Sequence, residues 1–427
     1  MRTQLSKFIE NPTQFKKYLL QWSNSAREVA FLDSNSYPQK YSSFDCVLAV
    51  DAFTSIKTDY INAFEDLHQY QEQTKDWLFG YLSYDLKNDT EDLHSANFDG
   101  LEFPDLYFFQ PKKLFLLKGN QLEMHYLRFC DDEMESDFEE IIQSAVYTNL
   151  TSEVVIQPRI SKEEYVVKVE KMLEHIQRGD IYEANFCMEF FADNSVINPL
   201  DVYQKLNSIS EAPFSVYFKN DSQFLLSASP ERYLKKTATN IISQPIKGTS
   251  RRHTEIELDK KSKTDLEFNE KERSENIMIV DLVRNDLSRT ASKGSVEVEE
   301  LCGMYSFKQV HQMISTIVSQ VENTISPVEI LRTTFPMGSM TGAPKISAMN
   351  IIEKLEETKR GLYSGAVGYF TPNGDFDFNV VIRSILYNAQ NQYVSFSVGS
   401  AITSLSDPEK EYEECLLKAK AMFAVLS

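Results

Sequence analysis

The sequence lacks the patterns that mark disulfide-rich, zinc-binding and membrane proteins. Its five cysteines are odd in number, lie far apart and form no C-x-x-C pair, so neither a disulfide framework nor a thiolate zinc site is indicated. No apolar run approaches the roughly 18 residues that cross a membrane. The N-terminal segment also has no apolar stretch of the kind found in signal peptides. We therefore expect a soluble protein of a reducing compartment, the cytoplasm.

Positive charge is scarce, because 44 basic residues face 63 acidic ones and the net charge is −19. Such an excess argues against nucleic acid and anionic membrane surfaces as partners. It does not exclude an anionic substrate, which responds to the local field of its pocket. No internal repeat or low-complexity tract stands out. With 427 residues, 42% of them hydrophobic, the chain can bury a large core, and its length suggests two or three domains.

An acidic run at residues 131–140 interrupts the pattern and fits a solvated helix face or a connector. It suggests a boundary between an N-terminal part, residues 1–155, and a catalytic region, residues 156–427. Just beyond it, Ser161 and Glu164 form a capping box at the start of an amphipathic helix.

The pattern after this helix predicts strands connected by hairpins. The strongest hairpin signal is Asn373-Gly374, between expected strands at 365–370 and 379–386. Other expected strands lie at 184–191, 214–218, 224–228, 241–242 and 393–398. Antiparallel strands with interspersed helices indicate an α+β fold.

Lys247 lies in the run Gln-Pro-Ile-Lys-Gly-Thr, which ends at Thr249. A lysine between proline and glycine is held on a turn of fixed shape. If water is excluded from that turn, Lys247 is a candidate nucleophile. The alternative is an ordinary solvated loop lysine.

Two pairs of glutamates occur on predicted helices with i, i+3 spacing. Glu272 and Glu275 share one side of a helix that the following apolar run predicts to be buried. Glu411 and Glu414 share a stripe with Lys418 at the border of the apolar face of the C-terminal helix. Buried carboxylates are costly unless paired or metal-bound, and oxygen ligands favour magnesium. The second pair also fits an ordinary surface ion pair between Glu414 and Lys418.

A glycine-rich segment, residues 335–345, precedes another amphipathic helix. Gly338 and Gly342 would let the backbone approach a ligand, and free N–H groups there would favour an anion. The spacing differs from that of a nucleotide P-loop, and a plain strand-to-helix connector fits equally well. Arg383 is expected in mid-strand after three apolar residues. A buried arginine needs a carboxylate partner, from the protein or from a substrate.

Taken together, these motifs resemble the chorismate-utilising enzymes, a family that includes the anthranilate, aminodeoxychorismate, isochorismate and salicylate synthases. The resemblance is dense over residues 160–427 and weaker over residues 1–155. The motifs that carry it occur in order as GYLSYDLKN (80–88), SPE (229–231), PIKGT (245–249), KERSEN (271–276), IVDLVRNDLSR (279–289), GSMTGAPK (338–345), RGLYSGAVGYF (360–370) and VVIRSI (380–385), followed by Glu411 and Glu414.

Lys247 distinguishes the branches of that family. The anthranilate synthases carry alanine at the corresponding position, whereas the aminodeoxychorismate synthases carry lysine. The isochorismate and salicylate synthases have a water-activating lysine where this chain has Glu183, a position that is often glutamine in relatives. Many relatives also carry a histidine where this chain has Gln312. We expect the adjacent His311 to be structural, with no catalytic role.

The resemblance implies amination of chorismate at carbon 4, with Mg²⁺ as cofactor and a glutamine amidotransferase partner as the ammonia donor. The alternative is anthranilate synthesis, but the L-L-E-S motif for tryptophan feedback in that branch is absent here. A catalytically inactive binding subunit is a further alternative. The chain is expected to carry neither an amidotransferase domain nor a lyase domain.

The resemblance also implies roles for individual residues. Lys247 would attack carbon 2 of chorismate, and burial is expected to lower its pKa so that it is neutral. The implied fold is one compact α+β body of two large antiparallel sheets packed as a sandwich, with helices outside. The implied site residues are Lys247 and Glu272 as catalytic residues, Gly248, Thr249, Thr341, Tyr363, Arg383, Gly399 and Lys418 as substrate-binding residues, and Glu275, Glu411 and Glu414 as magnesium ligands.

Overall fold

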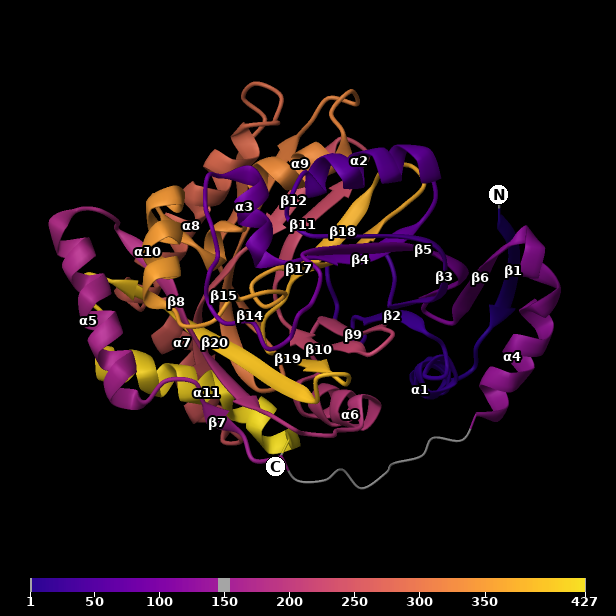
Figure 1. Ribbon diagram of the computed structural model, residues 1–427, viewed down its shortest axis with the longest axis horizontal. Coiled ribbons are helices and arrows are strands. Elements are labelled where there is room, and N and C mark those ends of the chain that lie inside the picture. Colours follow the sequence, from indigo (N-terminus) through magenta and orange to yellow (C-terminus); the bar gives the residue numbers. More distant parts are fainter. Residues whose placement is uncertain (1, 145–153, 427) are drawn as a thin grey trace.

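A computed structural model describes residues 2–144 and 154–426 of the chain. The strands in these ranges form antiparallel ladders that join into one continuous 20-stranded network, which divides into two large sheets (Figure 1). The first sheet runs in the order β1 (Arg2–Phe8), β6 (Gln121–Leu127), β5 (Leu106–Lys118), β3 (Cys46–Thr58), β2 (Glu28–Asp33), β9 (Phe214–Asn220), β10 (Gln223–Ser229), β19 (Ser384–Asn388), β20 (Tyr393–Thr403) and β8 (Glu183–Ala192), with β7 (Gln157–Pro158) and β16 (Gly342–Ala343) on the other edge of β8.

The second sheet begins on the same β3–β5 ribbon and continues in the other direction. It runs from β5 through β4 (Leu78–Leu82), β17 (Ala366–Phe370), β18 (Phe376–Val380), β11 (Arg232–Thr237), β12 (Asn240–Gln244) and β15 (Val310–Gln320), with β13 (Ile246–Arg251) and β14 (Glu297–Ser306) also paired to β15.

The shared ribbon divides its pairing between the two sheets. Residues 113–118 of β5 pair with β6, whereas residues 106–109 pair with β4. A register irregularity between Ala52 and Thr54 of β3 lies between the two halves, and such irregularities increase strand bending. The paired strands β3 and β5 therefore extend into both layers.

Apolar side chains from the two sheets meet in a common core. One cluster joins Val47 and Phe218 of the first sheet to Tyr81 and Phe370 of the second. The rings of Tyr81 and Phe218 lie 5.6 Å apart, edge to face. This contact layer is the interior of the predicted sandwich.

Helices cover the outer faces of the sheets (Figure 1). Apolar side chains on the outer face of the first sheet pack against five helices: α1 (Pro12–Ser23), α4 (Met134–Gln143), α5 (Lys162–Arg178), α6 (Pro199–Ser210) and α11 (Pro408–Leu426). The second sheet is covered by α2 (Ala63–Thr74), α8 (Glu270–Ser288) and α9 (Pro327–Thr334). The remaining helices are α3 (Lys87–Thr90), α7 (Ile256–Glu267) and α10 (Lys345–Leu355). The predicted α+β class is confirmed.

Local sequence signals explain several boundaries. Ser161 and Glu164 complete the predicted capping box of α5, and Gly179 ends the helix with φ +83°. Gly374 takes φ +76° in the predicted hairpin between β17 and β18. Asp407 accepts hydrogen bonds from the first backbone N–H groups of α11. In each case the sequence shows the residue that the boundary needs: a side chain that caps free backbone N–H groups, or a glycine that adopts positive φ.

The expected single strand at 379–386 is wrong. The structure divides it into β18, which ends at Val380, and β19, which starts at Ser384. Arg383 takes φ +52° between them, and its carbonyl accepts a hydrogen bond from Ala228 N–H. The apolar run continues through this break, so periodicity alone could not reveal it.

None of the helices in the described ranges is long and apolar enough to span a membrane.

Candidate active site

A cavity of about 910 Å³ opens where the two sheets meet α8 and α11. Asn185 and Ser397 belong to the first sheet and line one side, whereas β13 and Gln312 belong to the second sheet and line the other. The predicted site residues that line this cavity are Lys247, Gly248, Thr249, Glu272, Glu275, Tyr363, Arg383, Gly399, Glu411, Glu414 and Lys418. Residues that are up to 171 positions apart in sequence, from Lys247 to Lys418, therefore share one chamber.

A distortion in β13 sets the position of Lys247. The ladder with β15 is irregular between Ile246 and Thr249, so Lys247 and Gly248 form a local bulge. Gly248 takes φ +93°, and a Cβ on it would meet Glu272 Oε2 at 3.2 Å. Glycine is favoured here by both conformation and space, which explains why the lysine is followed by glycine.

Lys247 is protonated in the resting site. Its Nζ donates a 2.8 Å hydrogen bond to Glu183 Oε1, and the two side chains are only 12% and 2% exposed. Burial lowers the pKa of Lys247, but the carboxylates of Glu183, Glu275 and Glu231 together raise it by more, so the pKa lies above its usual value. The expectation that burial would leave this lysine neutral is therefore wrong, because nearby carboxylates outweigh desolvation.

Glu231 is a site residue that the sequence-based assignment missed. It is buried on the short connection between β10 and β11, and it lines the cavity together with Lys247. Burial raises its pKa to about 7, while Ser339 and Lys247 lower it in part. The sequence analysis used the S-P-E tripeptide that contains Glu231 only as a family motif and assigned no role to the glutamate itself.

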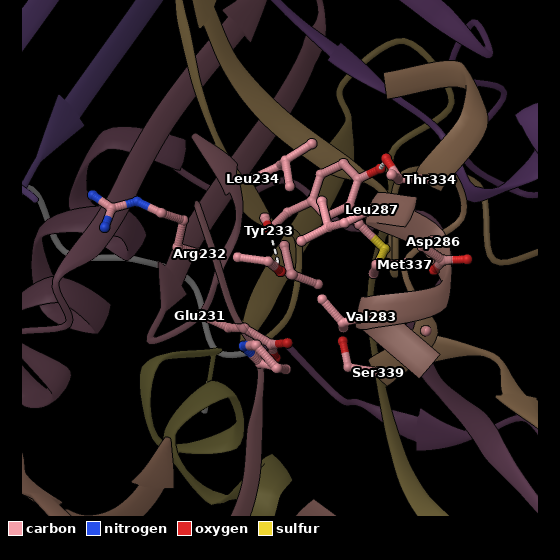
Figure 2. Close-up of a pocket in the computed structure, with 14 residues that line it drawn as sticks. Glu231, Arg232, Tyr233, Leu234, Val283, Asp286, Leu287, Thr334, Met337 and Ser339 are labelled. Atoms are coloured by element: carbon pink, nitrogen blue, oxygen red, sulfur yellow. Dashed lines mark hydrogen bonds between the residues drawn. The ribbon is translucent and has the colours of Figure 1, made fainter. Parts of the chain in front are cut away.

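Glu231 also lines a small second pocket of about 20 Å³. Figure 2 shows the Glu231 carboxyl group directed toward Val283 and Ser339, with Leu287 and Met337 further along the wall. Apolar surroundings disfavour the charged form of a carboxyl group. A buried carboxyl group whose pKa lies near 7, in the same cavity as a lysine, has the properties of a general acid.

Lys271 contacts both glutamate pairs. Its Nζ lies 3.4 Å from Glu411 Oε1 on α11 and 3.8 Å from Glu275 Oε1 on α8. The pKa of Glu272 is raised by burial and then by repulsion from Glu414. The two E-x-x-E pairs therefore face the same region of the cavity, as the magnesium hypothesis requires.

The donor set at this position fits a hard divalent cation. Burial raises the pKa of Glu275 to about 7, and its Oε1 is buried without a hydrogen-bond partner among the described residues. Four carboxylates around one cavity supply only oxygen ligands, which Mg²⁺ prefers. Within residues 2–144 and 154–426, no three acidic, histidine or cysteine side chains are already gathered as ligands. Lys271, 37% exposed in its side chain, lies between two of the carboxylates instead.

Arg383 is a cavity-lining cation that has no ion-pair partner among residues 2–144 and 154–426. It lines the cavity, burial lowers its pKa, and Tyr363 and Glu414 oppose that change. No ion pair in the described part of the chain includes its guanidinium group. The left-handed backbone conformation at Arg383 separates it from the sheet ladder. A desolvated guanidinium group of this kind is suited to a planar carboxylate.

The glycine-rich segment contributes less than expected. Thr341 is fully buried, does not line the cavity, and its N–H donates to the Gly338 carbonyl. Thr341 was expected among the substrate-binding residues, but the structure places it behind the cavity wall. Gly399 does line the cavity, and its carbonyl accepts a 2.8 Å hydrogen bond from Lys418. Lys418 also pairs with Glu414 at 2.6 Å, so it supports the wall of the site.

Arg360 positions the glycine-rich segment against β8. This buried residue donates hydrogen bonds of 2.6 Å to the carbonyls of Met340 and Asn185, and it pairs with Glu356 at 2.7 Å. Glu356 in turn accepts the backbone N–H of Cys187. The sequence signal was the RGLY motif, in which only the tyrosine had been assigned a role.

Arg360→Met is expected to destabilise the fold by about 3–5 kcal/mol, because it leaves Glu356 buried without its charge partner. Urea unfolding of the purified variant measures the loss. The matched control is Arg332→Met, which breaks an ion pair with Glu329 whose side chains are 51% and 37% exposed. That control should change stability by less than about 1 kcal/mol. Equal effects would contradict the positioning role of Arg360.

His311 has no free ring nitrogen for catalysis. Its Nδ1 lies 2.8 Å from Ser306 Oγ, and its Nε2 lies 3.2 Å from Asp259 Oδ1. The ring is buried and does not line the cavity. The structural role predicted for His311 agrees with these contacts.

The chain belongs to the chorismate binding enzyme family, whose model matches residues 27–424. Among curated relatives, it is 31% identical to aminodeoxychorismate synthase component 1 of Bacillus subtilis, with 80% of this chain and 75% of that protein covered. It is 34% identical to a probable chloroplastic aminodeoxychorismate synthase of Oryza sativa, with 80% of this chain covered. The chain spans only 42% of that rice protein and 29% of the Arabidopsis thaliana aminodeoxychorismate synthase.

Solved structures share the fold. The anthranilate synthase component I of Streptococcus pneumoniae superposes with a TM-score of 0.78 at 25% identity, covering 91% of this chain and 93% of that one. The menaquinone-specific isochorismate synthase of Escherichia coli gives 0.79 at 16% identity, covering 100% and 94%. The second likeness concerns the fold alone. The predicted fold and the predicted family are both confirmed.

Proposed function

We propose that the chain is component I of an aminodeoxychorismate synthase, which replaces the carbon 4 hydroxyl of chorismate with an amino group. The observation that carries the proposal is Lys247, buried in the large cavity among carboxylates. In the family that the chain resembles, lysine at this position accompanies amination at carbon 4, whereas the anthranilate synthases carry alanine there. The Bacillus subtilis relative bears the same name as the proposed activity.

Substrate binding is assigned to the cationic side of the cavity. Arg383, which has no ion pair among the described residues, would bind the enolpyruvyl carboxylate of chorismate, and the buried Tyr363 lies near it. Gly248, Thr249 and Gly399 would contact the substrate from the wall. Binding in this pose would hold carbon 2 toward Lys247, and positioning of this kind removes much of the entropic barrier.

The chemistry is divided between Lys247 and Glu231. The neutral amine of Lys247 would form a bond to carbon 2 while the carbon 4 hydroxyl leaves as water, with a proton donated by Glu231. Ammonia would then bond to carbon 4 and give one proton back to the Glu231 carboxylate, while the carbon 2 bond electrons would return to the lysine nitrogen. A covalent intermediate replaces one difficult displacement with two easier steps. The raised pKa of Glu231, about 7, suits a donor at neutral pH.

Magnesium is assigned to the glutamate side of the cavity. Glu275, Glu411 and Glu414 would hold it, and Glu272 would lie beside it. When bound, Mg²⁺ would neutralise the ring carboxylate and act as a Lewis acid. Lys271 would have to leave the position between Glu275 and Glu411 that it occupies in the structure, and its partly exposed side chain has room to do so.

The same proposal includes a partner and a biological setting. Ammonia would come from a separate glutamine amidotransferase, and the product would serve p-aminobenzoate and folate synthesis. We further propose that residues 1–155 and 156–427 act as one body, supported by the pairing of β2 with β9 and of β4 with β17. The cytoplasmic setting expected from the sequence stays a prediction, since the plant relatives are named chloroplastic.

Anthranilate synthase component I is the second candidate. The chain is 31% identical to anthranilate synthase component 1 of Aquifex aeolicus, with 82% of this chain and 74% of that protein covered. The two candidates differ in the carbon that receives nitrogen. The lysine at position 247 favours carbon 4.

Product analysis tests the proposal. The purified chain is incubated with chorismate, Mg²⁺ and an ammonium salt, and we expect 4-amino-4-deoxychorismate by mass spectrometry and chromatography. Chelation of the metal with EDTA should abolish turnover, and added Mg²⁺ should restore it. Fluorescent anthranilate as the main product would refute the assignment in favour of the second candidate. Absence of turnover with ammonium and with an amidotransferase would instead favour an inactive binding subunit.

A further inference from the structure

The resting site holds a buried ion pair that the proposed chemistry must first undo. The Nζ of Lys247 donates to Glu183 Oε1 at 2.8 Å, and neither side chain has much access to water. Lys247 is protonated in this state because carboxylates raise its pKa. An ammonium group has no lone pair with which to attack carbon. The proposed reaction therefore needs a group that removes one proton from Nζ.

Several acidic groups face Lys247 from different elements. Glu275 and Glu272 come from α8, Glu231 from the connection before β11, Glu414 from α11, and Glu183 from β8. Among the described residues, Glu183 alone makes an ion pair with Lys247 within 4.0 Å. Glu183 is thus the acceptor that a proton can reach across an existing hydrogen bond.

Glu183 is held rigidly in that position. It is the first residue of β8, where its backbone pairs with Ala343 on one edge and Thr403 on the other. Gly342 packs so closely that a Cβ on it would collide with the Glu183 carbonyl oxygen. The second carboxyl oxygen, Oε2, is buried and has no hydrogen-bond partner among the described residues. A single strong contact, to Lys247, therefore sets the direction of this carboxyl group.

We propose that Glu183 is the proton acceptor that converts Lys247 into a neutral nucleophile. The inference rests on the proposed amination of chorismate and adds a residue to it. One Nζ–H bond breaks and one Oε1–H bond forms, so an ammonium–carboxylate pair becomes an amine–carboxylic acid pair. The pair has zero net charge before and after the transfer.

Conservation of charge is the physical advantage of this arrangement. Loss of the same proton to water would leave a carboxylate in the cavity with no positive partner, and a buried unpaired charge is strongly unfavourable. Transfer to Glu183 avoids that state. When the lysine nitrogen later recovers its bond electrons from carbon 2, the same proton returns from Oε1 to Nζ, and the resting pair is restored.

The test compares Glu183→Gln with the wild-type chain across pH 6 to 8. In the variant, Lys247 has to release its proton to solvent, and Glu275 and Glu231 still oppose that release. We expect kcat of the variant to fall about 100-fold at the acid end with KM for chorismate little changed. The ratio of variant to wild-type kcat should then rise about tenfold for each pH unit. Because both proteins keep Glu231, its titration cancels in the ratio.

Glu183→Asp is the matched control. It keeps a carboxylate one methylene shorter, so its rate is expected to be lower, but its ratio to wild type should not change with pH. A constant ratio for Glu183→Gln would overturn the proposal, because a purely structural loss lowers the rate equally at every pH.

A titration of Lys247 provides a readout that needs no turnover. In NMR spectra of the full chain with isotopically labelled lysine, Lys247→Ala identifies the signal. We expect the wild-type signal to remain that of an ammonium group beyond pH 9 and to titrate at lower pH in Glu183→Gln, since burial then acts with less opposition. A wild-type Lys247 that is already neutral at pH 7 would overturn the proposal, because Glu183 would have no proton to take. Failure of the product assay would refute the proposed amination and leave this titration result standing on its own.

Discussion

Lys247→Ala is expected to lower the rate of 4-amino-4-deoxychorismate formation by about 10³-fold or more, the scale seen when a covalent nucleophile is removed. The reason is the placement of Nζ in the cavity beside the carboxylates of α8 and α11. Without the amine, carbon 2 has no protein nucleophile, and ammonia must react in a single displacement. Steady-state rates with saturating ammonium and chorismate, together with product identification, provide the measurement.

The control for charge removal is Lys260→Ala. Lys260 lies on α7, and its side chain is 70% exposed beside Glu257, whose side chain is 81% exposed. Its loss should leave the rate within about twofold, because exposed ion pairs contribute little. If Lys247→Ala formed aminodeoxychorismate at the wild-type rate, the lysine would not be the nucleophile.

Glu231→Gln is expected to reduce kcat by about 10²- to 10⁴-fold, the usual contribution of a general acid. Burial raises the pKa of this carboxyl group to about 7, and in the proposed reaction its protonated form would be the donor. The wild-type rate should therefore fall as pH rises through about 7, and the residual rate of the variant should lack that descending limb. A variant whose pH profile keeps the limb would assign it to another group, such as Glu275, whose pKa is also about 7.

The same variant gives a stability measurement that verifies its fold. The folded state raises the pKa of Glu231 above the value of an unfolded glutamate, so ionisation above pH 7 opposes folding, whereas below about pH 4 both states are protonated. Glu231→Gln removes that penalty. Relative to wild type, the variant should therefore gain stability between pH 5 and pH 8, by about 3 kcal/mol at most. Unfolding by urea at the two pH values measures the difference.

Much of the site was predictable because local spacing encodes it. The i, i+3 glutamates, the fixed lysine turn and the glycine that follows are short-range patterns, and the structure brings Lys247, Glu275 and Glu414 to one cavity. The α+β sandwich followed from hairpin signals and from the family resemblance. These features depend on residues that are neighbours in sequence or on one helix face.

The features that were missed depend on contacts between distant residues. The charge of Lys247 is set by Glu183, which is 64 positions earlier. The break at Arg383 needs the carbonyl contact with Ala228 from another strand. The role of Arg360 depends on two backbone carbonyls that only the fold brings near it. Periodicity and spacing contain no information on such pairings.

The ribbon of β3 and β5 has a consequence for how the chain can be divided. Because the ribbon extends into both sheets, strands of the N-terminal part pair with strands of the C-terminal region in both of them. In the first sheet β2 pairs with β9, and in the second sheet β4 pairs with β17. Removal of residues 1–155 would leave β9 and β17, which are seven and five residues long, with unpaired backbone edges in the middle of the fold, and such edges recruit other chains. The residues proposed to be catalytic all lie beyond that point in sequence, yet a fragment that starts there is expected to be prone to aggregation. The N-terminal part thus covers strand edges of the C-terminal region that could otherwise pair with another chain.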